Sequence, residues 1–207
     1  MQDNGEAIYR FEKNTTQGIT STVNNRNKKK DMISQSKNVR EVFKEYFRTA
    51  ITPKRILELG TGSREFTHMI YMLRKEIDED FDFITVDFTK YITSTPEEIW
   101  SLIYKRIIYL ETDIFSHIGF IGNLIIDDTL VLCDNGDKPR EVRLFTPYLK
   151  SRCVMMAHDY FYDMDEFKRK GGWPVCEITY GDISDLGLIP YHQDLMKNAF
   201  WLSLIKP

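Results

Sequence analysis

Acidic residues stand at or just after the ends of several short apolar segments in this 207-residue chain. The series consists of Glu58, Asp87, Asp113, Asp134 and Asp159. Asp and Glu make up 31 of the 207 residues, so random placement would rarely put an acid at every one of these ends. In an open α/β sheet, ligands bind beyond the carboxyl ends of the strands. If the apolar segments are strands of one sheet, these acids mark its functional edge.

The first acid precedes a turn that reads Glu58-Leu-Gly60-Thr-Gly62-Ser-Arg64. Gly60 and Gly62 allow the backbone to turn tightly and let a ligand approach the main chain. A pyrophosphate is bound by N–H donors and positive potential, so a glutamate at this place favours a ligand that carries an ammonium or sulfonium charge. Asp87, 25 residues beyond Gly62, can accept hydrogen bonds from both hydroxyls of a ribose.

Alternating strands and helices would bring these acids to one edge. Short apolar runs predict strands over residues 55–60, 81–88, 107–110, 130–133 and 153–157. The apolar spacing is typical of helices over residues 39–47, 66–77, 97–105 and 140–149. Such alternation favours a mostly parallel sheet with helices on both faces. Two late strands, over residues 177–180 and 199–205, are expected to form an antiparallel pair at one edge, with no helix between them.

The turn and the later acids resemble the motif series of class I S-adenosylmethionine (SAM)-dependent methyltransferases. The resemblance is carried by Glu58-x-Gly60-x-Gly62, then Asp87, then Glu111-Thr-Asp113, and it spans about residues 37–206. It implies a Rossmann-like α/β fold with a mostly parallel seven-stranded sheet, helices on both faces and a C-terminal antiparallel strand pair. It also implies that the cofactor is SAM.

The same resemblance implies a role for each cofactor-binding residue. The turn would contact the methionine moiety, Asp87 the ribose, and Asp113 the adenine amino group. The turn residues implied are Glu58, Gly60, Thr61, Gly62 and Ser63. The sequence departs from the family at Arg64, where the third glycine usually stands.

A second resemblance covers the later part of the chain. Asp134-Asn-Gly-Asp137-Lys138, followed by a helix and then by His158-Asp159, is similar to metal-dependent small-molecule O-methyltransferases, including the macrocin-type sugar O-methyltransferases and the cephalosporin-hydroxylase-like group. It implies a divalent metal held by Asp134, His158 and Asp159, with Asp137 as a competing candidate for the first ligand. His158 stands where the family usually has a second acid.

A metal or a basic side chain could each activate a hydroxyl of the substrate. A divalent cation held by carboxylates lowers the pKa of the hydroxyl and orients it. Mg²⁺ prefers oxygen ligands, and the His158 nitrogen shifts the preference toward Mn²⁺ or another transition metal. Lys138 or His158 could instead serve as a general base without any metal. The candidate catalytic residues are therefore Asp134, Lys138 and His158.

Composition and charge narrow the classes of partner. Apolar residues make up 42% of the chain and charged residues 29%, as in globular proteins. The net charge of −3 gives no electrostatic reason to expect a nucleic acid. No apolar run approaches the roughly 20 residues that a membrane span needs. We expect a cytoplasmic protein that acts on a small-molecule acceptor and has no membrane partner. Self-association into a homo-oligomer is possible.

The chain is expected to hold two parts. Residues 1–36 are polar and are predicted to form an N-terminal arm, which could close over the site as a lid. Residues 37–207 are predicted to form the methyltransferase domain.

Two alternative functions compete with methyl transfer to a hydroxyl of a small molecule such as a sugar or a secondary metabolite. The departures at Arg64 and His158 favour a non-catalytic or degenerate methyltransferase-like protein that binds SAM. An NAD-dependent oxidoreductase is the other alternative. Glu58 ahead of the glycines and Arg64 in place of the third glycine argue against it.

Overall fold

The computed structural model describes residues 38–62, 64–77, 80–88, 106–170 and 175–207. Four parts of the sequence-based prediction lie outside these ranges. They are the arm over residues 1–36, the first residue of the predicted domain, Ser63 of the turn, and the helix predicted over residues 97–105.

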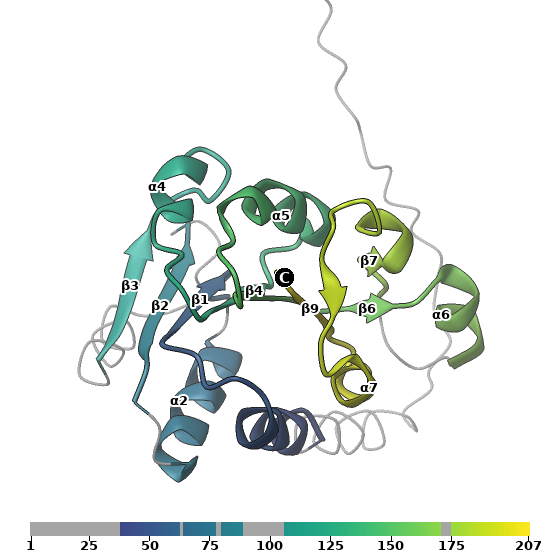
Figure 1. Cartoon of the computed structure of the whole chain (residues 1–207), viewed down its shortest axis with the longest axis horizontal. Coiled ribbons are helices and arrows are strands. Elements are labelled where there is room, and N and C mark those ends of the chain that lie inside the picture. The colour runs from purple at the N-terminus through teal and green to yellow at the C-terminus, as the bar shows by residue number, and fades with distance from the viewer. Residues whose placement is uncertain (1–37, 63, 78–79, 89–105, 171–174) are drawn as a thin grey trace, which may run out of the picture.

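A seven-stranded sheet runs through the middle of the molecule, with its strands in the order β3-β2-β1-β4-β5-β9-β8 (Figure 1). The first five strands in the chain are parallel neighbours. They are β1 (Arg55–Leu59), β2 (Asp82–Asp87), β3 (Ile107–Glu111), β4 (Thr129–Cys133) and β5 (Val154–Ala157). β9 (Leu202–Ile205) runs antiparallel to both β5 and β8 (Ile189–Pro190). The mostly parallel sheet and its C-terminal antiparallel pair are therefore confirmed.

The predicted partner of the last strand was wrong. The segment predicted as a strand over residues 177–180 contains β7 (Ile178–Thr179), which pairs in parallel with β6 (Tyr160–Phe161) in a separate small sheet. A 3₁₀ helix (Tyr180–Asp182) follows at once, closed by a capping box between Thr179 and Asp182, so the chain turns away after two residues. β8 takes the edge position instead.

A short helix also lies between the late strands, where none was predicted. This is α7 (Gln193–Met196), which continues into a 3₁₀ helix (Lys197–Ala199). Its Met196 is fully buried against the sheet. Four residues are too few to show a helical repeat in the sequence, which is why the pattern missed it.

Helices cover both faces of the sheet (Figure 1). One face packs against α4 (Ile118–Gly122) and α5 (Lys138–Phe145), which continues into a 3₁₀ helix (Thr146–Tyr148). The other face packs against the helix over residues 38–49, α2 (Glu65–Ile77) and α7. α6 (Met164–Lys170) lies beside the small sheet. Every residue of β4 is buried, because a central parallel strand is covered on both sides.

The strand order reverses between β1 and β4, and the backbone ladder continues past the ends of these strands. Gly60 N donates to Val86 O at 2.8 Å, Asp134 N to Leu59 O at 2.8 Å, and His158 N to Cys133 O at 3.2 Å. These bonds hold Gly60, Asp134 and His158 at the carboxyl edge of neighbouring strands. A reversal of strand order at this edge is where open α/β sheets bind ligands.

Among the described residues, no helix has the length and apolar character required to cross a membrane.

Candidate active site

The two glycines of the turn have different surroundings. Gly60 has a φ of +101°, and a Cβ placed on it would lie 2.5 Å from the carbonyl oxygen of Asp134. Gly62 has a φ of +46°, and a Cβ on it would meet nothing within 4 Å in the described part of the chain. Position 60 therefore requires glycine, because the loop after β4 leaves no room for a Cβ. Gly62 is the glycine that faces open space, where a ligand can approach.

Arg64, which stands where the third glycine was expected, also has a left-handed backbone, with a φ of 66°. Its N–H donates to Thr61 O at 2.8 Å and closes the turn. The hydroxyl groups of Thr61 and Thr85 lie 2.6 Å apart in a buried hydrogen bond. Thr61 thereby fastens the turn to β2. The turn keeps a glycine-like geometry at Arg64 despite the side chain.

Glu58 lies beneath the turn and is 1% exposed. The hydroxyl of Thr67 donates to its Oε2 at 2.7 Å, while Oε1 is buried without a hydrogen-bond partner among the described residues. Burial raises the pKa of Glu58 to about 8. A buried polar atom without a partner costs free energy, so a donor or a positive charge brought by a ligand would stabilise this carboxyl group.

Asp87, at the end of β2, binds the turn directly. Its Oδ2 accepts a hydrogen bond from Gly62 N at 2.7 Å, and its Oδ1 accepts one from Phe88 N at 2.6 Å. The residue is 2% exposed. A carboxylate can accept about four hydrogen bonds, so both oxygens keep the capacity to accept from ribose hydroxyls. The link between Asp87 and Gly62 was not predicted from the sequence.

Asp113 follows β3 and bonds to its own loop. Its Oδ2 accepts from the Ser116 hydroxyl at 2.5 Å, and its Oδ1 accepts from Phe115 N at 3.0 Å. These donors lower the pKa of Asp113. The structure thus gives Asp113 a role in shaping the loop, and the predicted contact with adenine stays a prediction.

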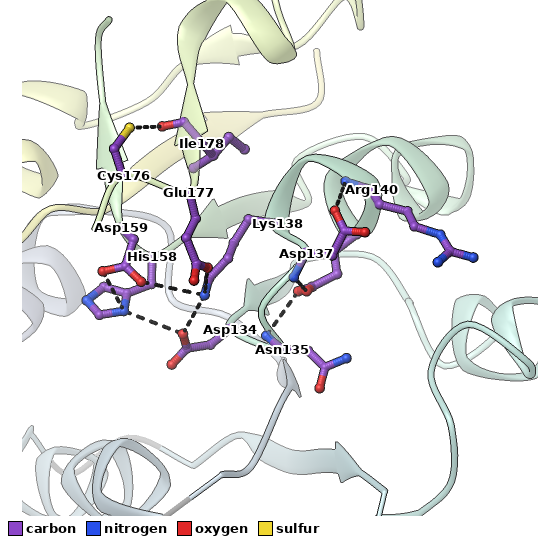
Figure 2. A network of polar contacts seen from close by, with 11 residues as sticks. Asp134, Asn135, Asp137, Lys138, Arg140, His158, Asp159, Cys176, Glu177 and Ile178 are labelled. Atoms are coloured by element: carbon purple, nitrogen blue, oxygen red, sulfur yellow. Dashed lines mark hydrogen bonds and ion pairs between the residues drawn. The ribbon is translucent and has the colours of Figure 1, made fainter. Parts of the chain in front are cut away.

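Lys138, the first residue of α5, lies at the centre of a second cluster, which we call the lysine cluster: Asp134, Lys138, His158, Asp159 and Glu177 (Figure 2). Lys138 Nζ lies 3.5 Å from Asp134 Oδ1 and 3.6 Å from Asp159 Oδ2, and it also forms an ion pair with Glu177. Burial alone would lower the pKa of Lys138, but the carboxylates of Asp134, Glu177 and Asp159 raise it above its ordinary value. A raised pKa keeps the ammonium protonated and weighs against Lys138 as a general base.

His158 also contacts acids of the lysine cluster. Its Nδ1 is 3.4 Å from Asp134 Oδ1 and 3.6 Å from Asp159 Oδ1, and 22% of its side chain is exposed. Its ring lies 5.0 Å from that of Trp201, which stacks on Phe66 at 4.9 Å. The two acids and the indole thus orient the imidazole, so that Nδ1 faces the carboxylates.

The structure brings all three predicted metal ligands together, but they do not fit a divalent cation as they are arranged. The Lys138 ammonium lies between the carboxylates of Asp134 and Asp159. A metal ion bound by these two carboxylates would be repelled by this positive charge. Within the described ranges, no three His, Cys, Asp or Glu side chains form a group that could hold a metal ion.

Asp137, the competing candidate for the first ligand, has a different role. Its side chain caps α5 by accepting from Arg140 N at 3.4 Å. Glu141 supports the same loop, because its carboxylate accepts from Asn135 N at 3.3 Å and from Asp137 N at 3.1 Å. Of the two aspartates, Asp134 is the one that joins the lysine cluster.

Sequence reasoning missed Glu177, Trp201 and Glu141. Glu177 reaches the cluster because its backbone N–H donates to Asp159 O at 3.1 Å. No local sequence pattern predicts that contact. Trp201 stands just before β9 and meets His158 only through the antiparallel return of the chain. Glu141 carried no standard signal, since a capping box has its Glu three residues after the N-cap and Glu141 is four residues after Asp137.

Comparisons with known proteins agree on the fold. No family model and no curated protein matches the sequence. Among solved structures, the apo structure of CmcI-N160 aligns with a TM-score of 0.56 and 12% identity over 82% of this chain and 72% of that one. A protein described as a caffeoyl-CoA O-methyltransferase from Staphylococcus aureus aligns at 0.51 and 10% identity, over 86% and 91%. The pyocyanin biosynthetic protein PhzM aligns at 0.52 and 13% identity, over 90% and 60%.

These alignments and the strand order β3-β2-β1-β4-β5-β9-β8 lead to one conclusion. The chain has the Rossmann-like fold that these solved structures share, with its acids at the sheet edge where open α/β folds bind ligands.

Proposed function

We propose that this protein is a SAM-dependent methyltransferase that methylates a hydroxyl group of a small molecule. The observation that carries the proposal is the acidic lining of the glycine turn. Asp87 accepts from Gly62 N, and the buried Glu58 lies beneath the same turn with one oxygen unpartnered among the described residues. SAM supplies an electrophilic methyl group on a sulfonium centre when it is bound.

The same lining argues against a dinucleotide. A pyrophosphate is held by free backbone N–H groups at a helix N-terminus, but here the Gly62 N–H is already donated to Asp87. The Asp87 carboxylate at the turn would also repel the pyrophosphate. A ligand with an ammonium group, a sulfonium centre and a ribose meets complementary charge and acceptors at this place.

Glu58, Gly62 and Asp87 are the residues that we propose hold the cofactor. Gly62 offers open main chain, Asp87 offers acceptor capacity for ribose hydroxyls, and Glu58 offers an unpartnered carboxyl oxygen beneath the turn. The roles of Ser63 and Asp113 toward the cofactor stay predictions from the resemblance.

His158 is the residue that we propose takes the proton from the acceptor hydroxyl. Asp134 and Asp159 lie on the Nδ1 side of the ring, which favours the tautomer with the proton on Nδ1 and the lone pair on Nε2. The proton of the hydroxyl would pass to Nε2. The indole of Trp201, 5.0 Å away, also contacts and restrains the ring.

The acceptor remains a proposal at the level of its class: a hydroxyl compound such as a sugar or a secondary metabolite. A cytoplasmic location also stays a prediction from the sequence, and self-association into a homo-oligomer stays open.

Calorimetric titration of the full chain with S-adenosylhomocysteine (SAH), SAM and NAD tests the cofactor. We expect the wild-type chain to bind SAH and SAM. Asp87→Asn should bind at least about tenfold more weakly, because a hydrogen bond to a charged group is worth about 1.5–3 kcal/mol. Asp165→Asn is the matched control, since the side chain of Asp165 is 92% exposed. Binding of NAD without SAH would contradict the proposal.

SAH release during incubation with SAM and a panel of hydroxyl compounds tests the reaction. His158→Asn should lower kcat by roughly 10²–10⁴-fold, the usual contribution of a general base, with SAH affinity unchanged. If SAH binds but no acceptor is methylated by the wild-type chain, the non-catalytic SAM-binding alternative is favoured instead.

A further inference from the structure

The ammonium group of Lys138 is approached by as many carboxylate side chains as it has N–H donors. An ammonium group has three N–H donors, and the carboxylates of three residues approach it: Asp134 at 3.5 Å, Asp159 at 3.6 Å, and Glu177 in an ion pair. These carboxylates come from three separate segments: the ends of β4 and β5, and the residue just before β7 (Figure 2). Lys138 is therefore the point at which three loops are joined.

Lys138 is also the most buried member of the lysine cluster. Its side chain is 4% exposed, against 25% for Asp134, 12% for Asp159 and 28% for Glu177. A divalent ion bound by these carboxylates would lie beside a positive charge that has little access to water. Repulsion between like charges is strong where water does not screen it.

The stem of Lys138 is held by secondary structure. The residue opens α5 directly after the capping residue Asp137, and Glu141 holds the preceding loop through two backbone N–H groups. The ammonium group is thus carried by a fixed helix start and cannot leave the cluster without breaking all three carboxylate contacts.

We propose that the Lys138 ammonium group is the fixed cation of this site and takes the position that the sequence assigns to a divalent metal. Lys138 also acts on His158 through Asp134, because Asp134 Oδ1 is shared between Lys138 Nζ at 3.5 Å and His158 Nδ1 at 3.4 Å. Lys138 is thus a positioning residue for His158, and methyl transfer at this site proceeds without a divalent metal. That catalytic consequence rests on the proposed function, whereas the metal-binding behaviour of the cluster does not.

Titration of the full wild-type chain with Mn²⁺, followed by calorimetry and by the electron paramagnetic resonance of free Mn²⁺, tests the proposal. We expect no Mn²⁺ binding that depends on Asp134. Lys138→Met keeps the length of the side chain and removes its charge. This variant should gain an Mn²⁺ site at least about a hundredfold tighter than any in the wild type, and that site should be lost in the double variant Lys138→Met with Asp134→Asn.

Two controls keep the result specific. Lys138→Arg retains the charge and should bind no Mn²⁺ at the cluster. Lys168→Met removes a lysine whose side chain is 72% exposed and should behave as the wild type. Mn²⁺ should raise the melting temperature of Lys138→Met and leave that of the other two variants unchanged.

Micromolar Mn²⁺ binding by the wild type that disappears in Asp134→Asn would overturn the proposal, since the metal would then coexist with Lys138 or displace it. If Lys138→Met does not fold, the comparison of the wild type with Asp134→Asn decides alone. SAH binding measured in the same samples keeps the two proposals distinct. Failure of the wild-type chain to bind SAH refutes the proposed function. Mn²⁺ binding at the cluster of the wild-type chain refutes only the role of Lys138.

Discussion

Replacing Glu58 with Gln should make the stability of the protein less dependent on pH. The carboxyl group is 1% exposed, and burial raises its pKa to about 8. Gln has nearly the same shape, cannot ionise, and can still accept the hydrogen bond that Thr67 donates at 2.7 Å. The variant therefore isolates the cost of ionising one buried acid.

The direction of the pH dependence of stability follows from the raised pKa of Glu58. Because the pKa of Glu58 is higher in the folded chain than in the unfolded chain, its contribution to stability is fully present below about 4.5 and is lost as pH rises through about 8. Each pKa unit corresponds to about 1.4 kcal/mol. The shift from 4.5 to about 8 thus corresponds to roughly 5 kcal/mol. The wild type should lose this free energy between pH 5 and 9, and Glu58→Gln should not.

Urea denaturation followed by circular dichroism, repeated at intervals from pH 5 to pH 9, measures the difference. We expect the two proteins to have similar free energies of unfolding at pH 5. At pH 9 the variant should be more stable by several kcal/mol, a large part of the roughly 5–15 kcal/mol that folded domains have in total. Glu76→Gln is the control, because the pKa of the exposed Glu76 is lowered by Lys44 and Arg40 and its contribution changes only at lower pH. Parallel pH profiles for the wild type and Glu58→Gln would refute the reasoning.

The remaining predictions concern the turn and the indole beside His158. Gly62→Ala should lower the free energy of unfolding by roughly 1–2 kcal/mol through its left-handed φ. Gly60→Ala should lower it more, because its Cβ would also meet the Asp134 backbone at 2.5 Å; equal losses in urea denaturation would contradict this packing. Trp201→Ala removes a side chain that is 1% exposed and should cost roughly 3–5 kcal/mol. Phe120→Ala, at a residue that is 56% exposed, should change stability by less than about 0.5 kcal/mol. A similar loss in both variants would show that Trp201 is not a core residue.

Much of the fold could be predicted because its signals are local. The segments that form β1, β2, β4 and β5 are mostly apolar, since strands covered on both faces favour apolar residues on both sides. The acids at the strand ends were also visible as single residues beside those runs. Parallel strands place their carboxyl ends at one edge, so the convergence of Glu58, Asp87, Asp134 and Asp159 followed from the strand assignment alone.

The partners of short segments could not be predicted in the same way. β7 and β8 have two residues each, and two residues carry neither a periodic pattern nor enough burial to specify a partner. The segment over residues 177–180 therefore looked like a strand of the main sheet, although it pairs with β6. Glu177 entered the site through that pairing, without any sequence signal.

The sequence by itself determined which residue types stand at the carboxyl edge of the sheet: a glycine turn, a row of acids and a histidine. Only the tertiary structure decided what these residues do to one another. It placed the Lys138 ammonium between Asp134 and Asp159, and it placed the Asp87 carboxylate on Gly62 N. The physical reason is that charge interactions depend on distance in space and on burial, and neither quantity can be read from the separation of residues along the chain.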